Sequence, residues 1–218
     1  MGEKNLTVLV TGFDPFGGEA VNPAFEAAKK LDGVTLAGAE VHTGEIPTIR
    51  YQCIAKVREY MGRFHPEIVI CVGQAGGSTG ISLERVAINC DDFRIPDNGG
   101  NQPVDETIVK DGPAAYFSTL PIRAMKTALL AEGIPAVISN SAGTFVCNHV
   151  FYTLMDTLAH EPVKRIGGFI HVPYLPEQTA KMTVPEASMS VDTIVKALRI
   201  VIETAVEEWK RSGGVARE

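Results

Sequence analysis

The sequence predicts an α/β protein of three layers, α/β/α, with a mostly parallel central sheet in a single domain over residues 1–218. Short β-rich apolar runs alternate with helix-length segments, which is typical of parallel strands joined by helices. With 218 residues, 45% of them hydrophobic, the chain can bury one core without disulfides or metals. Residues 84–111 break the alternation, so an inserted loop or hairpin region is expected there.

The first half of the chain contains three runs that predict strands and two segments that predict helices. Strands are expected at residues 6–10, 36–42 and 68–72, and helices at 23–31 and 49–64. Asn22 is the expected N-cap of the first helix, because its side chain can accept a hydrogen bond from a free backbone N–H. Pro23 suits the first helical position.

Regular structure resumes after the inserted region. Helices are expected at residues 121–131, 147–160 and 191–211, and strands at 136–139 and 168–172, while 84–89 is a candidate strand within the insertion. Gly133 is expected to close the first of these helices. Ser190 is the expected N-cap of the last helix, which carries an apolar stripe at helical spacing.

Composition and charge exclude several classes of protein. A net charge of −6 without a run of Lys and Arg argues against nucleic-acid binding. No apolar stretch approaches the roughly 20 residues that span a bilayer, and the first ten residues do not resemble a signal peptide. The four cysteines lack CxxC spacing, which favours a reduced, cytoplasmic setting. No group of His, Cys, Asp or Glu has the spacing of metal ligands, so no metal is expected.

Two glycine-rich segments, 11–18 and 73–77, follow predicted strands. Neither contains the Walker A lysine or a GxGxxG pattern, so neither matches a known phosphate-binding loop. The first segment carries Phe13 and Phe16, which suit an apolar pocket better than a cradle for pyrophosphate.

Cys147 has the setting of a reactive thiol. It follows a strand and a loop of small residues, and it opens a helix whose N-terminal dipole and free N–H groups stabilise a thiolate. The same N–H groups could hold the oxyanion of an acyl-transfer reaction. A cysteine that merely packs in the core is the alternative, and the pattern around Cys147 alone leaves both open.

His171 closes the predicted strand 168–172 and is the candidate base for Cys147. The chain between them has room for a helix and a short return, as a parallel β-α-β unit needs. Such a unit brings the carboxyl ends of both strands to one edge of the sheet. A hydrogen-bonded core histidine is the alternative. His149 is a rival base, but two residues beyond Cys147 on a helix it faces another way.

A catalytic base needs an orienting partner, and Glu84 is the best candidate. It follows a glycine-rich loop at a strand end and precedes an apolar run. An ordinary salt bridge with Arg85 or Arg94 is the alternative, and sequence spacing does not separate the two.

Seven segments together resemble the pyroglutamyl peptidase type I family, cysteine peptidases that remove an N-terminal pyroglutamyl residue. They are TGFDPFGG at 11–18, GQAGG at 73–77, ERVAIN at 84–89, RIPDNGGNQP at 94–103, DGPAAYFSTLP at 111–121, SAGTFVCNHVFY at 141–152 and GFIHVPYLPEQ at 168–178. They stand in the family's order and cover the chain from Thr11 to Gln178, which makes a chance match very improbable.

The resemblance implies a catalytic triad of Glu84, Cys147 and His171. In the mechanism that follows from it, Cys147 forms an acyl-enzyme, and the sequence leaves open whether Arg94 assists the oxyanion site. It implies a pocket for the pyroglutamyl ring built from Phe13, Phe16, Gln74, Phe145 and Val146, with Thr48, Arg94 and Ile95 as secondary members. A neutral lactam needs apolar walls and a few amide-reading groups, which fits these residue types. The family further implies peptide substrates with N-terminal pyroglutamate, no cofactor, a cytoplasmic location and a homotetramer.

Two other functions stand as alternatives. A nucleoside-phosphorylase-like activity predicts phosphate-dependent turnover that thiol alkylation does not affect. A non-catalytic lactam-binding protein predicts tight binding without product release and an unreactive Cys147. The set of Cys147, His171 and Glu84 counts against both.

Overall fold

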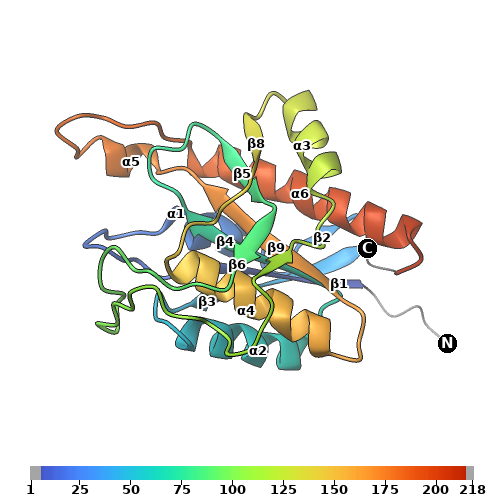
Figure 1. Cartoon of the computed structure of the whole chain (residues 1–218). Coiled ribbons are helices and arrows are strands. Elements are labelled where there is room, and N and C mark those ends of the chain that lie inside the picture. The colour runs from blue at the N-terminus through green and yellow to red at the C-terminus, as the bar shows by residue number, and fades with distance from the viewer. Residues whose placement is uncertain (1–5, 215–218) are drawn as a thin grey trace.

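A computed structural model describes residues 6–214 and places a central seven-stranded sheet between helices on both faces (Figure 1). The expectation that the chain starts without a signal peptide rests partly on residues 1–5, which lie outside the described residues, as do residues 215–218. Within residues 6–214, no helix is long and apolar enough to cross a membrane.

The central sheet has the strand order β2-β3-β1-β4-β9-β5-β8. Its strands are β1 (Leu6–Phe13), β2 (Thr35–Leu36), β3 (Ala39–Ile46), β4 (Ile68–Gln74), β5 (Ile81–Glu84), β8 (Ala136–Ser139) and β9 (Ile166–Val172). The neighbours β3, β1, β4 and β9 run parallel to one another, and β5 runs parallel to β8. The predicted α/β fold with a mostly parallel sheet is therefore confirmed.

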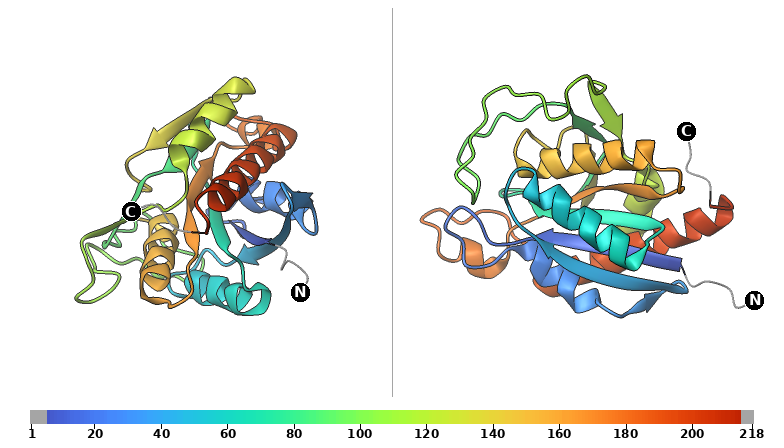
Figure 2. Two further views of the ribbon diagram at one scale, coloured as in Figure 1. Left: turned by 90° about the vertical axis from the view of Figure 1, so that its right-hand side faces the viewer. Right: turned by 90° about the horizontal axis from the view of Figure 1, so that it is seen from below.

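Helices cover both faces of the sheet. They are α1 (Pro23–Ala28), α2 (Gln52–Phe64), α3 (Ile122–Ala131), α4 (Val146–His160), α5 (Pro176–Thr179) and α6 (Val191–Arg211), with a short 3-10 helix at Lys29–Leu31. In the views of Figure 2, α2 and α4 lie on one face of the sheet and α6 on the other. Asn22 caps α1 and Ser190 caps α6 through their side chains, as predicted.

The strands contribute side chains to two hydrophobic clusters, one on each face of the sheet. This is because successive side chains of a strand point to opposite sides. On β1, Val8 and Val10 join the cluster that contains Leu198 of α6. Leu9, between them, joins the cluster that contains Val57 of α2. All of these side chains are buried, so both faces of the sheet are covered and the three-layer prediction is confirmed.

The inserted region forms a small second sheet with a long connection. Strand β6 (Val86–Ile88) pairs antiparallel with β7 (Ala115–Phe117). Residues 89–114 connect these two strands and contain no helix or strand of their own. The expected single strand at 84–89 is corrected, because Glu84 ends β5 in the central sheet and the chain then turns into β6.

The route from Cys147 to His171 also differs from the expectation of a parallel β-α-β unit. Strand β8, which precedes the helix of Cys147, runs antiparallel to β9, and β5 lies between them. Residues 140–145 carry the chain back to the carboxyl end of β4 and β9, where α4 begins. The two residues therefore do meet at one sheet edge, but through this return loop rather than through a crossover.

Candidate active site

Cys147 lies in the first turn of α4. The N-cap residue Phe145 supplies no side-chain hydrogen bond, and the first helical bond joins the His149 N–H to the Phe145 carbonyl at 3.1 Å. The N–H groups before it therefore lack partners within the helix and carry the positive end of its dipole. A thiolate at Cys147, or an oxyanion next to it, would lie beside these donors.

His171 lies near the end of β9 and is bonded to Glu84. Its Nδ1 lies 2.8 Å from Glu84 Oε1, and both side chains are buried. The ring also packs edge-on against Phe169, at 4.8 Å between centroids. Since Nδ1 is engaged by the carboxylate, Nε2 is the nitrogen left for the hydrogen bond between His171 and Cys147. The three groups thus form one hydrogen-bonded series.

The surroundings of His171 favour its charged form. Burial is the largest influence and would lower the pKa of His171, but the charge of Cys147 and its hydrogen bond act against it. The hydrogen bond and charge of Glu84 add to this, and together they raise the pKa of His171 to about 10. A histidine held between a cysteine side chain and a carboxyl group is the arrangement that can activate a sulfur nucleophile.

A pocket of about 550 Å³ opens over this series. Its lining residues are Phe16, Gln74, Ala75, Gly76, Gly77, Ser78, Ser82, Glu84, Ser139, Ser141, Ala142, Gly143, Phe145, Cys147 and His171. Among these, Glu84 is the one with a carboxylate, and that group is bonded to His171. The pocket therefore offers apolar walls and amide or hydroxyl groups, which suits an uncharged ligand.

The eight predicted binding residues are distributed unevenly around this pocket. Phe16, Gln74 and Phe145 line it, and the rings of Phe16 and Phe145 lie 6.0 Å apart. Phe13 and Val146 are buried in the hydrophobic cluster beneath it. The secondary members, Thr48, Arg94 and Ile95, are absent from its lining. Thr48 is buried and bonded to Asp14, whereas Arg94 is exposed. Their binding roles stay predictions.

Comparison with known proteins gives the family. A model of the family described as pyroglutamyl peptidase matches residues 6–208. The chain belongs to the pyroglutamyl peptidase family. A pyrrolidone-carboxylate peptidase of Bacillus thuringiensis is 52% identical over 203 residues, covering 92% of this chain and 94% of the relative. A pyrrolidone-carboxylate peptidase 1 of Ralstonia nicotianae is 53% identical over 211 residues, covering 95% and 98%. The family predicted from the sequence is thus confirmed.

Solved structures of the family share this fold. The crystal structure of pyroglutamyl peptidase I from Bacillus amyloliquefaciens matches with a TM-score of 0.89 at 51% identity, covering 93% of this chain and 95% of that one. A mutant pyrrolidone carboxyl peptidase from the hyperthermophile Pyrococcus furiosus matches with a TM-score of 0.89 at 44% identity, covering 93% and 99%.

Gly73 is a site residue that the sequence analysis treated only as part of a loop. It pairs with His171 across β4 and β9, and a Cβ at this position would lie 3.0 Å from Cys147 Sγ and 2.7 Å from the Phe169 ring. The absence of a side chain therefore lets the sulfur approach the sheet edge. A glycine directly after the apolar run 68–72 was the available signal.

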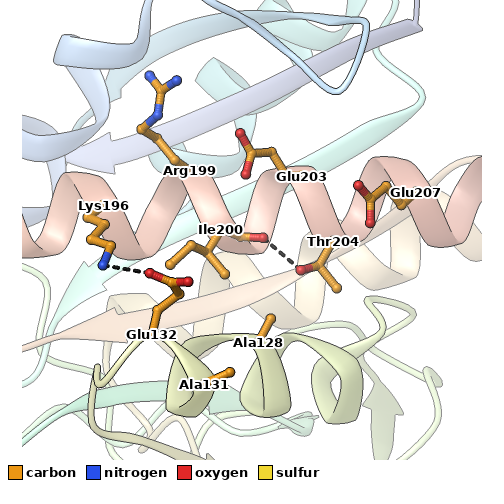
Figure 3. Close-up of a pocket in the computed structure, with 9 residues that line it drawn as sticks. All are labelled: Ala128, Ala131, Glu132, Lys196, Arg199, Ile200, Glu203, Thr204 and Glu207. Carbon is orange, nitrogen blue, oxygen red and sulfur yellow. Dashed lines mark hydrogen bonds and ion pairs between the residues drawn. The ribbon is translucent and has the colours of Figure 1, made fainter.

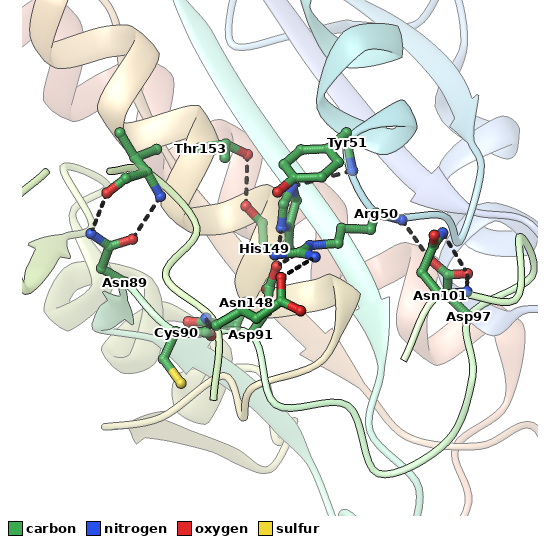
Figure 4. Close-up of polar contacts among 12 residues, drawn as sticks. Arg50, Tyr51, Asn89, Cys90, Asp91, Asp97, Asn101, Asn148, His149 and Thr153 are labelled. Carbon is green, nitrogen blue, oxygen red and sulfur yellow. Dashed lines mark hydrogen bonds and ion pairs between the residues drawn. The ribbon is translucent and has the colours of Figure 1, made fainter. Parts of the chain in front are cut away.

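His149, the rival base, belongs to a separate buried network (Figure 4). Its Nδ1 lies 2.8 Å from Asp91 Oδ2, and its Nε2 accepts the Tyr51 N–H at 3.2 Å. The Asp91 carboxylate also accepts from Arg50 Nε at 2.7 Å. Both ring nitrogens of His149 are therefore engaged away from Cys147, and the network ties the inserted region to α4.

A second pocket, of about 500 Å³, lies between α3 and α6 (Figure 3). Its lining includes Ala128, Ile200 and the ion pair between Lys196 and Glu132. No Cys or His lines it, so the described residues place no thiol or imidazole there. Within residues 6–214, no group of three or more His, Cys, Asp or Glu could hold a metal ion.

Proposed function

We propose that this member of the pyroglutamyl peptidase family hydrolyses the bond after an N-terminal pyroglutamyl residue through a thiol mechanism. Cys147 is the nucleophile, His171 the base and acid, and Glu84 the carboxylate that orients His171. The observation that carries the proposal is the hydrogen-bonded series from Glu84 through His171 to Cys147, at the mouth of a pocket and at an uncapped helix N-terminus.

The reaction has two halves. The Cys147 sulfur, as a thiolate paired with the His171 imidazolium, attacks the pyroglutamyl carbonyl, and free N–H groups of the first turn of α4 stabilise the oxyanion. The tetrahedral species collapses as His171 donates its proton to the leaving amine, which gives a thioester acyl-enzyme. Water, deprotonated by His171, then attacks the thioester and releases pyroglutamate and the thiol.

The pocket supports a neutral lactam as the acyl group. Phe16 and Phe145 supply apolar surface for the ring, and Gln74 can hydrogen-bond a lactam amide. The one carboxylate in the described lining is engaged by His171, so no anion is left to bind the α-ammonium of an ordinary N-terminal residue. A pocket that bonds a lactam carbonyl also discriminates against proline, which lacks that oxygen.

A comparison of two reporter amides tests this function. The chain is expected to hydrolyse a pyroglutamyl amide at least about 10⁴-fold more efficiently than the matching prolyl amide, because the prolyl ring leaves the polar groups of the pocket unpaired. A thiol-blocking reagent should abolish the reaction. Equal rates on both amides, turnover that requires phosphate, or insensitivity to the reagent would each contradict the proposal.

A close approach of backbone to sulfur gives a second prediction. Gly73→Ala is expected to lower kcat/KM for the pyroglutamyl amide by about 100-fold, because the new Cβ would displace the Cys147 sulfur. Gly62→Ala is the matched control, since a Cβ at Gly62 meets no atom within 4 Å. Native kcat/KM in a folded Gly73→Ala variant would show that the sulfur does not need this approach.

The family resemblance extends to a cytoplasmic homotetramer, and this too stays a prediction. Pyroglutamyl peptides are the proposed partners of the site.

A further inference from the structure

We propose that Gln178 is a positioning residue that holds the carboxamide of Gln74 with its NH₂ group turned toward the substrate pocket. The pocket then offers a hydrogen-bond donor to the carbonyl of the lactam ring. This inference rests on the proposed function, since it assigns how the same pocket recognises its acyl group.

The orientation of Gln178 follows from a backbone group that can only donate. The Leu175 N–H donates to Gln178 Oε1 at 2.9 Å. Because a backbone N–H needs an acceptor, this contact identifies which branch of the Gln178 carboxamide is oxygen. The other branch is therefore the NH₂ group.

The orientation of Gln74 follows in turn. Gln178 Nε2 donates to Gln74 Oε1 at 2.9 Å, so the Gln74 oxygen faces Gln178. The NH₂ group of Gln74 is the branch that remains, and it makes no hydrogen bond with another described residue. Gln74 lines the substrate pocket, whereas Gln178 does not. The free donor of Gln74 is thus available to a ligand.

Gln178 is well placed to hold this arrangement. It is 3% exposed, and its backbone N–H donates to the Leu175 carbonyl at 3.0 Å in the first turn of α5. If both carboxamides turned over, the NH₂ group of Gln178 would face the Leu175 N–H, donor against donor, in a buried site. That alternative is disfavoured because two buried polar groups would lose their partners.

The fixed polarity matters for recognition. A pyroglutamyl ring carries one carbonyl acceptor and one N–H donor, and a prolyl ring lacks the carbonyl. An unrestrained Gln74 could present either end of its carboxamide to the ring. With Gln178 in place, Gln74 presents its NH₂ donor to the ring. This donor bonds the ring carbonyl, which is the group that a pyroglutamyl residue has and a prolyl residue lacks.

Two variants of similar size test the inference. In Q178E the introduced carboxylate can only accept, so it keeps the Leu175 N–H and draws the NH₂ group of Gln74 away from the pocket. We expect KM for a pyroglutamyl amide to rise by about 100-fold and the pyroglutamyl-to-prolyl ratio of kcat/KM to fall at least tenfold. Q178M leaves Gln74 unrestrained, and KM should rise by about tenfold.

Two measurements and one control variant separate positioning from a general loss of structure. The rate at which iodoacetamide alkylates Cys147 should stay within about twofold of native in both variants, because Gln178 does not contact the thiol. Q52E is the matched control, since Gln52 is exposed at the start of α2, and native kinetics are expected. Thermal melting reports whether each variant folds.

The outcomes are distinct. A native chain that fails to cleave the pyroglutamyl amide overturns the proposed function itself. A cleaving native chain whose folded Q178E and Q178M variants keep native KM and selectivity overturns only the role of Gln178. If neither variant folds, competition on the native chain decides: γ-butyrolactone should inhibit and tetrahydrofuran should not. Equal competition by both would mean that no donor reads the ring carbonyl.

Discussion

Cys147→Ala is expected to lower kcat for hydrolysis of a pyroglutamyl amide by about 10⁴-fold or more, because it removes the nucleophile on which both half-reactions depend. The fold should be unaffected, since Cys147 is only partly buried and the substitution leaves a small side chain at the helix start. Steady-state kinetics and a thermal melt of the same sample check the two halves of this prediction. Full activity in the variant would remove Cys147 from the mechanism.

The other three cysteines provide internal controls. Burial raises the pKa of the Cys71 thiol to about 12 and that of the Cys53 thiol well above its ordinary value. Partial burial, followed by the Asp105 carboxylate, raises the pKa of Cys90. These three groups therefore remain thiols at neutral pH and react slowly. Mass spectrometry after brief alkylation should find the label on Cys147, and Cys90→Ser should leave kcat/KM unchanged.

Glu84→Gln is expected to lower kcat by about 100-fold or more and to move the alkaline limb of its pH profile to lower pH. Burial lowers the pKa of His171, but its interactions with Cys147, and then those with the Glu84 carboxyl group, raise it to about 10. Removal of this carboxyl group lowers that pKa, so the imidazolium that protonates the leaving amine is lost earlier as pH rises. Rates measured from neutral pH upward on native and variant chains give the shift. An unmoved alkaline limb would mean that Glu84 does not govern the charge of His171.

The same substitution should change how stability depends on pH. A histidine whose pKa is raised on folding from 6.5 to about 10 stabilises the folded state fully below 6.5, and this contribution is lost as pH rises through about 10. In Glu84→Gln the raised pKa falls, so the variant should lose less stability than the native chain across that interval. Denaturant unfolding at both ends of the interval measures the difference. Glu59→Gln, at an exposed ion pair on α2, is the control.

The sequence predicted most elements because their signals are local. Asn22 and Ser190 cap helices within one turn of their own positions, and the apolar runs around Val8 and Ile70 alternate between the two faces of the sheet. The placement of Cys147 in the first turn of a helix was local in the same sense. Such signals depend on neighbours a few residues away, and these are visible in the chain.

Strand direction was not predictable in this way. The approach of Cys147 to His171 was expected from a parallel crossover, yet β8 runs antiparallel to β9 with β5 inserted between them. The residues of a short apolar run do not indicate which strand it will pair with, or whether that pairing is parallel or antiparallel. The expectation that Cys147 lies near His171 was still correct. The return loop 140–145 brings the start of α4 to the same sheet edge to which a parallel crossover would have brought it.

The sequence by itself determined the order of elements, the buried faces, the thiol in the first turn of α4 and, through its ordered motifs, the family. Only the tertiary structure decided that Glu84 bonds His171 rather than Arg85 or Arg94, that Gly73 leaves room for the Cys147 sulfur, and that Gln178 orients Gln74. The reason is physical: periodicity and capping act within a few residues. The bonding of a buried polar group instead depends on which distant strand or loop is packed beside it.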